Sequence, residues 1–215
     1  MLQVYLVRHG ETQWNAERRI QGQSDSPLTE KGERQAHQVG ERAKALGITH
    51  IISSDLGRTR QTAAIIADAC GCEVTFDPRL RELDMGVLEE RHIDSLTGDE
   101  EAWRRQLVNG TSDGRIPDGE SMQELSDRMH AALAACLELP QGSRPLVVSH
   151  GMALGCLVST ILGLPAWAER RLRLRNCSIS RIDYQQSPWL ASGWVVETAG
   201  DVSHLDAPAL DELQR

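Results

Sequence analysis

The chain has 215 residues, 40% of them hydrophobic, so it is long and apolar enough to fold around a sizeable core rather than remain disordered. Its formal net charge of −8 argues against non-specific binding of nucleic acid. The longest apolar stretch, residues 152–167, is interrupted by Gly, Ser, Thr and Pro, as in a core helix rather than a membrane span. We therefore expect neither nucleic acid nor a membrane as a partner.

The five cysteines favour a reducing compartment. Their number is odd, Cys70-Gly71-Cys72 is not a CxxC motif, and most of them fall in predicted helices or strands. The N-terminus enters a strand directly, without the charged and apolar regions of a signal peptide. We expect a cytoplasmic protein with reduced thiols.

Residues 2–8 predict a first strand, because they are mostly β-branched, aromatic or aliphatic. The strand ends abruptly at Arg8 and His9, and Gly10 permits a sharp turn or a close approach of the backbone to a ligand. Ligands of open α/β sheets bind at this end of the strands. A histidine after a strand is also common as a surface or capping residue, and this segment alone leaves both alternatives open.

Residues 11–28 are rich in turn-forming residues and predict a loop. Residues 30–46 predict a helix, with Thr29 as its N-cap and Gly47 at its end.

The alternation of strands and helices continues beyond this helix. A strand is expected over residues 50–54, then a helix capped by Asp55 and ended by Gly71, then a short strand over residues 73–76. Strands separated by helices of 10–15 residues imply right-handed crossovers and a parallel sheet.

Residues 78–120 break the alternation and predict an insertion with one or two short helices that covers the sheet edge. Further helices and strands are expected over residues 121–136, 145–149, 152–162, 178–184 and 193–198, the last two paired as a hairpin. The fold class is then a three-layer α/β/α domain spanning residues 1–215, with a mostly parallel central sheet.

Charged side chains and histidines follow the ends of the predicted parallel strands, which meet at one edge of the sheet. The first strand delivers Arg8 and His9, Arg58 and Arg60 follow the second, and His150 follows the strand over residues 145–149. These cations, beside helix N-termini with free N–H groups, predict a site for a phosphoryl group. Two imidazoles can also indicate a metal, but the surrounding cations oppose one and no metal-ligand motif is present.

A cationic phosphoryl site without a Walker loop favours a nucleophile supplied by the protein. Neutral imidazole attacks well near pH 7, so His9 is the candidate. The charge that develops on the phosphoryl oxygens would be stabilised by three other residues, Arg8, Arg58 and His150. Glu82 follows the third strand and is the best carboxyl to protonate the leaving oxygen, although a surface ion pair is an equally good explanation of it.

Four ordered segments resemble motifs of the histidine phosphatase superfamily, also called the phosphoglycerate mutase family, and the likeness extends along the whole chain. The segments are Leu6-Val7-Arg8-His9-Gly10-Glu11-Thr12, Ser53-Ser54-Asp55-Leu56-Gly57-Arg58-Thr59-Arg60-Gln61-Thr62-Ala63, Leu80-Arg81-Glu82-Leu83 and Val148-Ser149-His150-Gly151. The resemblance implies a phosphohistidine on His9 and a proton donor and acceptor at Glu82. It also implies a phosphate pocket of Arg8, Arg58 and His150.

The resemblance also implies a substrate-binding set around this pocket. Arg104-Arg105 resembles the arginine pair that mutases direct at the substrate carboxylate. The other expected substrate-binding residues come from the strand ends and the following loops: Gly10, Glu11, Thr12, Asn15, Gln21, Gly22, Arg60, Gly151 and Met152. By contrast, Arg170, Arg171, Arg173 and Arg175 read as a solvated face, with an interaction patch as the alternative.

Two activities are implied, on a small phosphorylated metabolite and without a metal or permanently bound cofactor. A mutase would interconvert 3- and 2-phosphoglycerate in glycolysis, primed by 2,3-bisphosphoglycerate, and a phosphatase would pass the phosphoryl group to water. The loop over residues 21–29 looks more like the phosphatase branch. The sequence also departs from the glycolytic mutases in its shorter insertion and in a tail over residues 201–215 that is acidic and contains no Lys. A non-catalytic module that binds phosphorylated ligands is a remote alternative, and the oligomeric state stays open.

Overall fold

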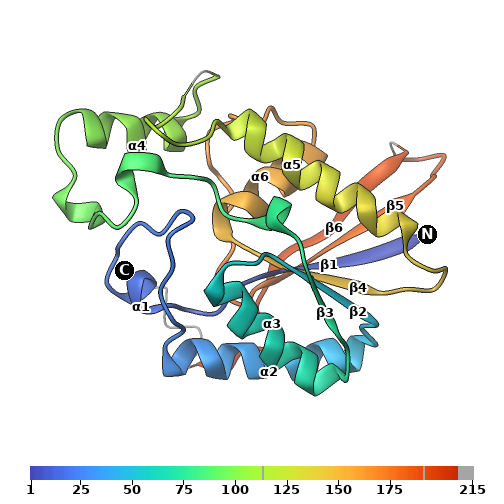
Figure 1. The fold of residues 1–215 in the computed structure, drawn as a ribbon. Helices are drawn as coiled ribbons and strands as arrows, with labels where there is room; N and C mark the ends of the chain where they lie inside the picture. Colours follow the sequence, from blue (N-terminus) through green and yellow to red (C-terminus); the bar gives the residue numbers. More distant parts are fainter. Residues whose placement is uncertain (113, 191, 208–215) are drawn as a thin grey trace.

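A six-stranded sheet with the order β3-β2-β4-β1-β5-β6 forms the centre of the computed structural model, which describes residues 1–112, 114–190 and 192–207 (Figure 1). Its strands are β1 (Leu2–Arg8), β2 (His50–Ser53), β3 (Val74–Phe76), β4 (Pro145–Ser149), β5 (Ile179–Gln185) and β6 (Gly193–Asp201). The β3-β2-β4-β1 part is parallel, and β5 and β6 join it as an antiparallel hairpin. The predicted mostly parallel sheet is confirmed.

Helices cover both faces of the sheet and give the three expected layers (Figure 1). On one face lie α2 (Glu30–Leu46) and α3 (Gly57–Cys70), and on the other α5 (Met122–Ala135) and α6 (Gly151–Ile161). Within β1, Val4 and Leu6 belong to the hydrophobic cluster beneath α5 and α6, whereas Tyr5 and Val7 belong to the cluster beneath α2 and α3. Burial on both faces explains why β1 is apolar without alternation.

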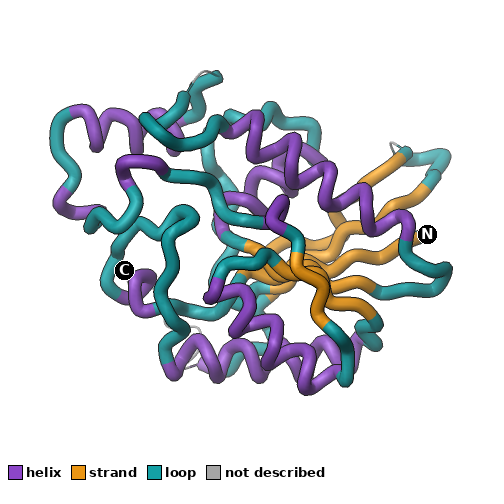
Figure 2. The backbone as a smooth tube through the Cα atoms, in the orientation of Figure 1, coloured by secondary structure: helices purple, strands orange, loops and turns teal. Residues whose placement is uncertain are grey.

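Between β3 and α5 the chain is mostly loop, as Figure 2 shows. This insertion contains α4 (Asp99–Asn109) and three single-turn 3-10 helices, η1 (Pro78–Leu80), η2 (Gly86–Leu88) and η3 (Ile93–Ser95). It lies beyond the carboxyl ends of the parallel strands, together with α1 (Gln13–Ala16), a short helix inside the segment that was predicted to be loop (Figure 1). The remaining short element, η4 (Cys136–Glu138), extends α5.

The ends of α2 are as predicted, and the start of α3 is not. Thr29 caps α2 by accepting the N–H of Gly32, and Gly47 ends it in the left-handed conformation at φ 68°. The predicted cap of α3, Asp55, was wrong, because its carboxylate is paired with Arg81 at 2.6 Å. A residue distant in sequence, Asp25, accepts the first N–H groups of α3 instead.

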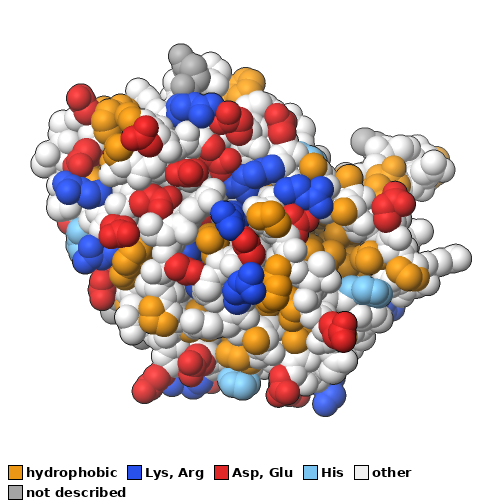
Figure 3. All heavy atoms as spheres, viewed as in Figure 1, with side chains coloured by type: hydrophobic (Ala, Val, Ile, Leu, Met, Phe, Trp, Pro, Cys, Tyr) orange, Lys and Arg blue, Asp and Glu red, His pale blue; other side chains and the backbone are white. Residues whose placement is uncertain are grey.

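The structure also describes the surface charges, the state of the cysteines and the lengths of the apolar helices. On the face shown in Figure 3, acidic and basic side chains lie intermingled. All five cysteines are free thiols. No helix in the described part of the chain is long and apolar enough to cross a membrane.

Candidate active site

Three parallel strands bring the sequence motifs together at one edge of the sheet. The register pairs Arg8 of β1 with Ser149 of β4, so the residues that follow both strands, His9 and His150, are neighbours. Their ring centroids lie 5.2 Å apart, and both side chains are buried. The predicted convergence of the strand ends is confirmed.

The geometry around His9 leaves one ring nitrogen available as a nucleophile. Its Nδ1 lies 2.8 Å from the carbonyl oxygen of Gly10, which can only accept, so Nδ1 carries the proton and Nε2 has a free lone pair. Burial, with the guanidinium groups of Arg58 and Arg8 nearby, holds the pKa of His9 well below its usual value. The backbone is held as well, because Asn176 donates to the carbonyl of His9 at 2.9 Å.

Arg58 is almost wholly buried, with 1% of its surface exposed, and is held on several sides. Its Nη1 donates to the Ser24 carbonyl at 2.8 Å and to Asp25 at 3.1 Å, and its Nη2 donates to the Gly22 carbonyl at 2.7 Å. Its Nε donates to His150 Nδ1 at 3.2 Å. Of the five N–H groups of a guanidinium, one on Nη2 then has no protein acceptor within the described residues, and it can bind a phosphoryl oxygen.

The structure gives His150 a different immediate environment from the one expected. Its Nδ1 accepts from Arg58 and its Nε2 lies 2.9 Å from Ser54 Oγ, so both ring nitrogens have protein partners. Burial and the nearby Arg58 hold the pKa of His150 well below its usual value. His150 thus orients Arg58, and a direct contact with the phosphoryl group stays a prediction.

Arg8 enters the site beside Gly151. Its Nη1 donates to the carbonyl of Leu174 at 2.8 Å. A Cβ on Gly151 would lie 3.2 Å from Arg8 Nε, so the absence of a side chain there leaves room for the guanidinium.

The carboxylate of Glu82 sits at the start of α6. Its Oε2 accepts the N–H of Met152 at 3.0 Å, and its Oε1 accepts the N–H of Ala153 at 2.9 Å. The alternative of a surface ion pair finds no support, because no arginine partner of Glu82 is present among the described residues. Arg128 fixes the backbone here by donating to the Glu82 carbonyl at 2.8 Å.

The prediction of free N–H groups at the helix N-termini was wrong for α3 and α6. Those at the start of α3 bond to Asp25 and those of Met152 and Ala153 bond to Glu82. These carboxylates satisfy the helix ends, so the N–H groups that they accept are not available to an anion.

Two adjoining cavities open at this edge, with volumes of about 360 and 440 Å³. The first contains His9 and Arg58, and Arg8, Glu82, Met152 and Arg170 line both. Of the expected substrate-binding residues, five line one or both cavities: Asn15, Gln21, Gly22, Gly151 and Met152.

Three expected binding residues serve the local structure instead. Gly10 approaches α2 rather than a ligand, because a Cβ there would lie 2.5 Å from the carbonyl oxygen of Gly32. Glu11 pairs with Lys31 at 3.3 Å, and Thr12 is the buried N-cap of α1.

The three remaining expected arginines also have other partners. Arg60 donates to the Asp55 carbonyl and stacks over the ring of Phe76. Arg104 and Arg105 both pair with Glu101, at 2.7 and 2.8 Å, and line neither of the two cavities. An i, i+3 and i, i+4 arrangement on one exposed helix face explains this pairing.

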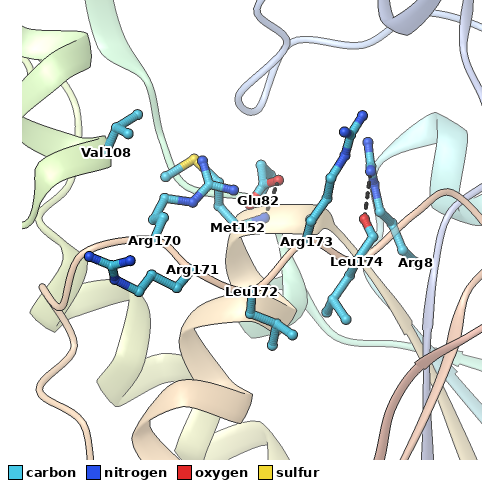
Figure 4. Close-up of a pocket in the computed structure, with 10 residues that line it drawn as sticks. Arg8, Glu82, Val108, Met152, Arg170, Arg171, Leu172, Arg173 and Leu174 are labelled. Carbon is cyan, nitrogen blue, oxygen red and sulfur yellow. Dashed lines mark hydrogen bonds between the residues drawn. The ribbon is translucent and has the colours of Figure 1, made fainter. Parts of the chain in front are cut away.

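Sequence reasoning missed several residues that build the site. Glu89 was assigned to a charged stretch, yet it accepts the N–H groups of Gln23 and Ser24 at 2.7 and 2.8 Å and so fixes the loop that holds Arg58. Arg170, Arg171 and Arg173 are exposed, as the predicted solvated face requires, but they also line the larger cavity (Figure 4), which sequence reasoning did not foresee. No periodic signal marks such residues, because loops place them.

Among the described residues, no group of three or more His, Cys, Asp or Glu side chains could hold a metal ion. The site defined by the fold is a cavity lined by basic side chains around a buried histidine whose pKa is held well below its usual value.

Comparison with known proteins agrees with this class. Residues 4–197 match the model of the histidine phosphatase superfamily, branch 1. A relative from Salmonella arizonae, called probable phosphoglycerate mutase GpmB, is 88% identical over the full length of both chains.

Solved structures show the same fold. The structure of Bacillus stearothermophilus YhfR matches with a TM-score of 0.87 and 30% identity, over 95% of this chain and 99% of that one. The alpha-ribazole phosphatase of Shigella flexneri matches with a TM-score of 0.79 and 26% identity, over 93% and 96% of the two chains. The chain belongs to the histidine phosphatase superfamily.

Proposed function

We propose that the protein transfers phosphoryl groups of small phosphorylated metabolites through a phosphohistidine on His9. The observation that carries the proposal is a buried, neutral imidazole whose Nδ1–H is fixed by Gly10, in a cavity shared with Arg8, Arg58 and Glu82. In the first step Nε2 bonds to phosphorus while the ester P–O bond breaks, and Glu82 gives its proton to the leaving oxygen.

The second step reverses these roles. Glu82 takes a proton from an incoming hydroxyl or water, whose oxygen bonds to phosphorus as the N–P bond breaks. Arg8 and the remaining N–H of Arg58 balance the charge of the phosphoryl oxygens in both steps. His9 is released unchanged and Glu82 regains the proton that it gave, so neither step uses a metal.

The identity of the acceptor separates two candidate activities. Phosphoglycerate mutase activity is supported by the name of the relatives at 88% identity, and it would require 2,3-bisphosphoglycerate as a primer. Phosphatase activity is supported by the pairing of Arg104 and Arg105 with Glu101, which leaves the expected carboxylate-binding pair outside the cavities. A neighbour in structure, the mycobacterial glucosyl-3-phosphoglycerate phosphatase, matches with a TM-score of 0.79 and 26% identity, over 93% and 99% of the two chains. A cytoplasmic location belongs to this proposal, because phosphorylated metabolites of this kind are intracellular.

The test is the fate of a labelled phosphoryl group on the enzyme. Incubation with a reactive phosphodonor should give an acid-labile, base-stable adduct that the His9→Ala variant does not form. Addition of monophosphoglycerate should then yield labelled bisphosphoglycerate from a mutase and only labelled inorganic phosphate from a phosphatase. Equal labelling of the His9→Ala variant would place the nucleophile elsewhere.

A further inference from the structure

Of the arginines that line the two cavities, Arg8 donates to the carbonyl of Leu174, and the others fall into two groups. Four have a carboxylate partner, namely Arg18 with Asp94, Arg19 with Glu17, Arg58 with Asp25 and Arg171 with Glu169. Within the described part of the chain, Arg170 and Arg173 have neither an ion pair nor a side-chain hydrogen bond. Guanidinium groups stay charged, so two uncompensated cations face this cavity.

Both side chains project from one loop into the larger cavity. Figure 4 shows Arg170 reaching toward Glu82 and Met152, and Arg173 extending along Arg8. Arg171, between them, points away from both and pairs with exposed Glu169 at 2.6 Å. All three arginines line the larger cavity, but only Arg171 has a carboxylate partner among the described residues.

The loop is held in place at both ends. Near its start, the N–H of Arg170 donates to the carbonyl of Val108 in α4 at 3.0 Å. Gly110 lets the backbones approach, because a Cβ there would lie 2.5 Å from the Trp167 carbonyl oxygen. At the other end, Leu174 accepts from Arg8 at 2.8 Å. The backbone that carries the two arginines is therefore fixed before a ligand binds, which reduces the entropy cost of binding.

The environment of Arg170 is that of a cation inside a concave site. Arg170 is exposed where it lines both cavities, and the protein packed around its guanidinium lowers the pKa of that group through desolvation. Glu82 attracts it but lies too far away to form an ion pair. An anion brought between Arg170 and Arg173 would gain charge-assisted hydrogen bonds that no described protein group supplies.

We infer that Arg170 and Arg173 form a second anion subsite, which binds a carboxylate or second phosphate on the leaving group of the substrate. The inference rests on the proposed function, since it places the ester oxygen at Glu82, where the two cavities meet. The transferred phosphoryl group occupies the cavity of His9 and Arg58, and the second anion occupies the larger cavity. This loop therefore recognises the second anion. The C-terminal end of α4 only holds the loop in place, through Val108 and Gly110. Arg104 and Arg105 take no part in recognition.

Matched pairs of esters test the subsite. 2-Phosphoglycerate and glycerol 2-phosphate differ by a carboxylate, and glycerol 1,3-bisphosphate and glycerol 1-phosphate differ by a second phosphate. In at least one pair, the wild-type protein should have a higher kcat/KM for the ester with the additional carboxylate or phosphate. The pair that shows this preference identifies the second anion. Arg170→Met and Arg173→Met should each reduce that preference by roughly 10- to 100-fold, the range expected for a lost charge-assisted contact. Arg170→Lys should retain part of it.

Two further variants sharpen the comparison. Arg144→Met removes an exposed arginine just before β4, at the opposite edge of the sheet, and should keep the wild-type preference. The double variant Arg104→Ala/Arg105→Ala tests the rival subsite and should keep it as well. A preference lost in this double variant and retained in the Arg170 and Arg173 variants would overturn the inference. Equal loss on both members of each pair would also overturn it, since it would indicate an effect on Glu82 alone.

Binding separates this inference from the proposed function. In the His9→Ala variant, calorimetry should show tighter binding of the ester with the additional carboxylate or phosphate. Adding Arg170→Met to that variant should remove the difference in affinity. Absence of any difference in the His9→Ala variant would overturn the subsite. Absence of phosphoenzyme with this difference intact would overturn only the proposed phosphoryl transfer.

Discussion

Asp25 binds Arg58 through both the backbone and the side chain, its Oδ1 accepting the Arg58 backbone N–H at 3.2 Å and Nη1 at 3.1 Å. One carboxylate thus caps α3 and compensates a buried guanidinium. The loop after β1 and the helix after β2 are thereby joined at the site.

Replacing Asp25 with Ala should remove the helix cap and leave the buried charge of Arg58 without its carboxylate. We expect the free energy of unfolding to fall by about 2 kcal/mol, measured by urea denaturation. Asp94→Ala is a matched control, because it breaks only exposed contacts, with Arg18 and His92, and it should cost less than about 1 kcal/mol. Equal losses in the two variants would contradict the dual role of Asp25.

Replacing Glu82 with Gln should affect substrates according to their leaving groups. A general acid matters most when the leaving oxygen is strongly basic, so an alkyl phosphate should react roughly 100-fold more slowly or worse, and p-nitrophenyl phosphate should lose less than about tenfold. The comparison is made on kcat/KM for both esters with one enzyme preparation. The same loss on both esters would reduce Glu82 to a structural residue at the start of α6.

The two buried histidines should make stability depend on pH. His9 and His150 have folded-state pKa values well below the usual 6.5, first through burial and then through Arg58. Between those values and 6.5 the unfolded chain binds more protons, so the free energy of unfolding should fall as the pH is lowered through 6.5. Above 6.5 both histidines are neutral in both states and add no pH dependence.

The measurement is urea unfolding at several pH values for the wild type and the His150→Asn variant. Each histidine contributes a slope of up to about 1.4 kcal/mol per pH unit, so the variant should show a shallower decline. His37→Gln, on the exposed face of α2, is the control. Parallel curves for wild type and His150→Asn would show that His150 does not carry the effect.

Replacing Glu89 with Ala should loosen the loop that holds Arg58. The carboxylate accepts the N–H groups of Gln23 and Ser24, and the carbonyl of Ser24 accepts from Arg58. The amides of Gln23 and Ser24 should exchange with solvent roughly 10- to 100-fold faster, since a charge-assisted bond is lost from each. Hydrogen exchange measures this directly, with exposed Glu138→Ala as the control. Unchanged protection at both amides would remove Glu89 from the site.

The sequence was sufficient for the strand ends. Apolar runs ending in Arg8-His9 and in Ser149-His150 identify buried parallel strands, and parallel strands place their carboxyl ends at one edge whatever the details of the loops. His9, His150 and Arg58 could therefore be grouped without coordinates. Glu82 could be placed at the same edge for the same reason, although its partners at the start of α6 could not.

Only the tertiary structure decided which charges compensate one another. Asp25 rather than Asp55 caps α3, and Glu101 pairs with Arg104 and Arg105. The exposed side chains of Arg170 and Arg173 line the larger cavity beside Glu82. Helix and strand patterns repeat along the chain and can be read from it, because they arise from local backbone geometry. Ion pairs between loops join residues far apart in sequence, and they depend on backbone positions that no local pattern determines.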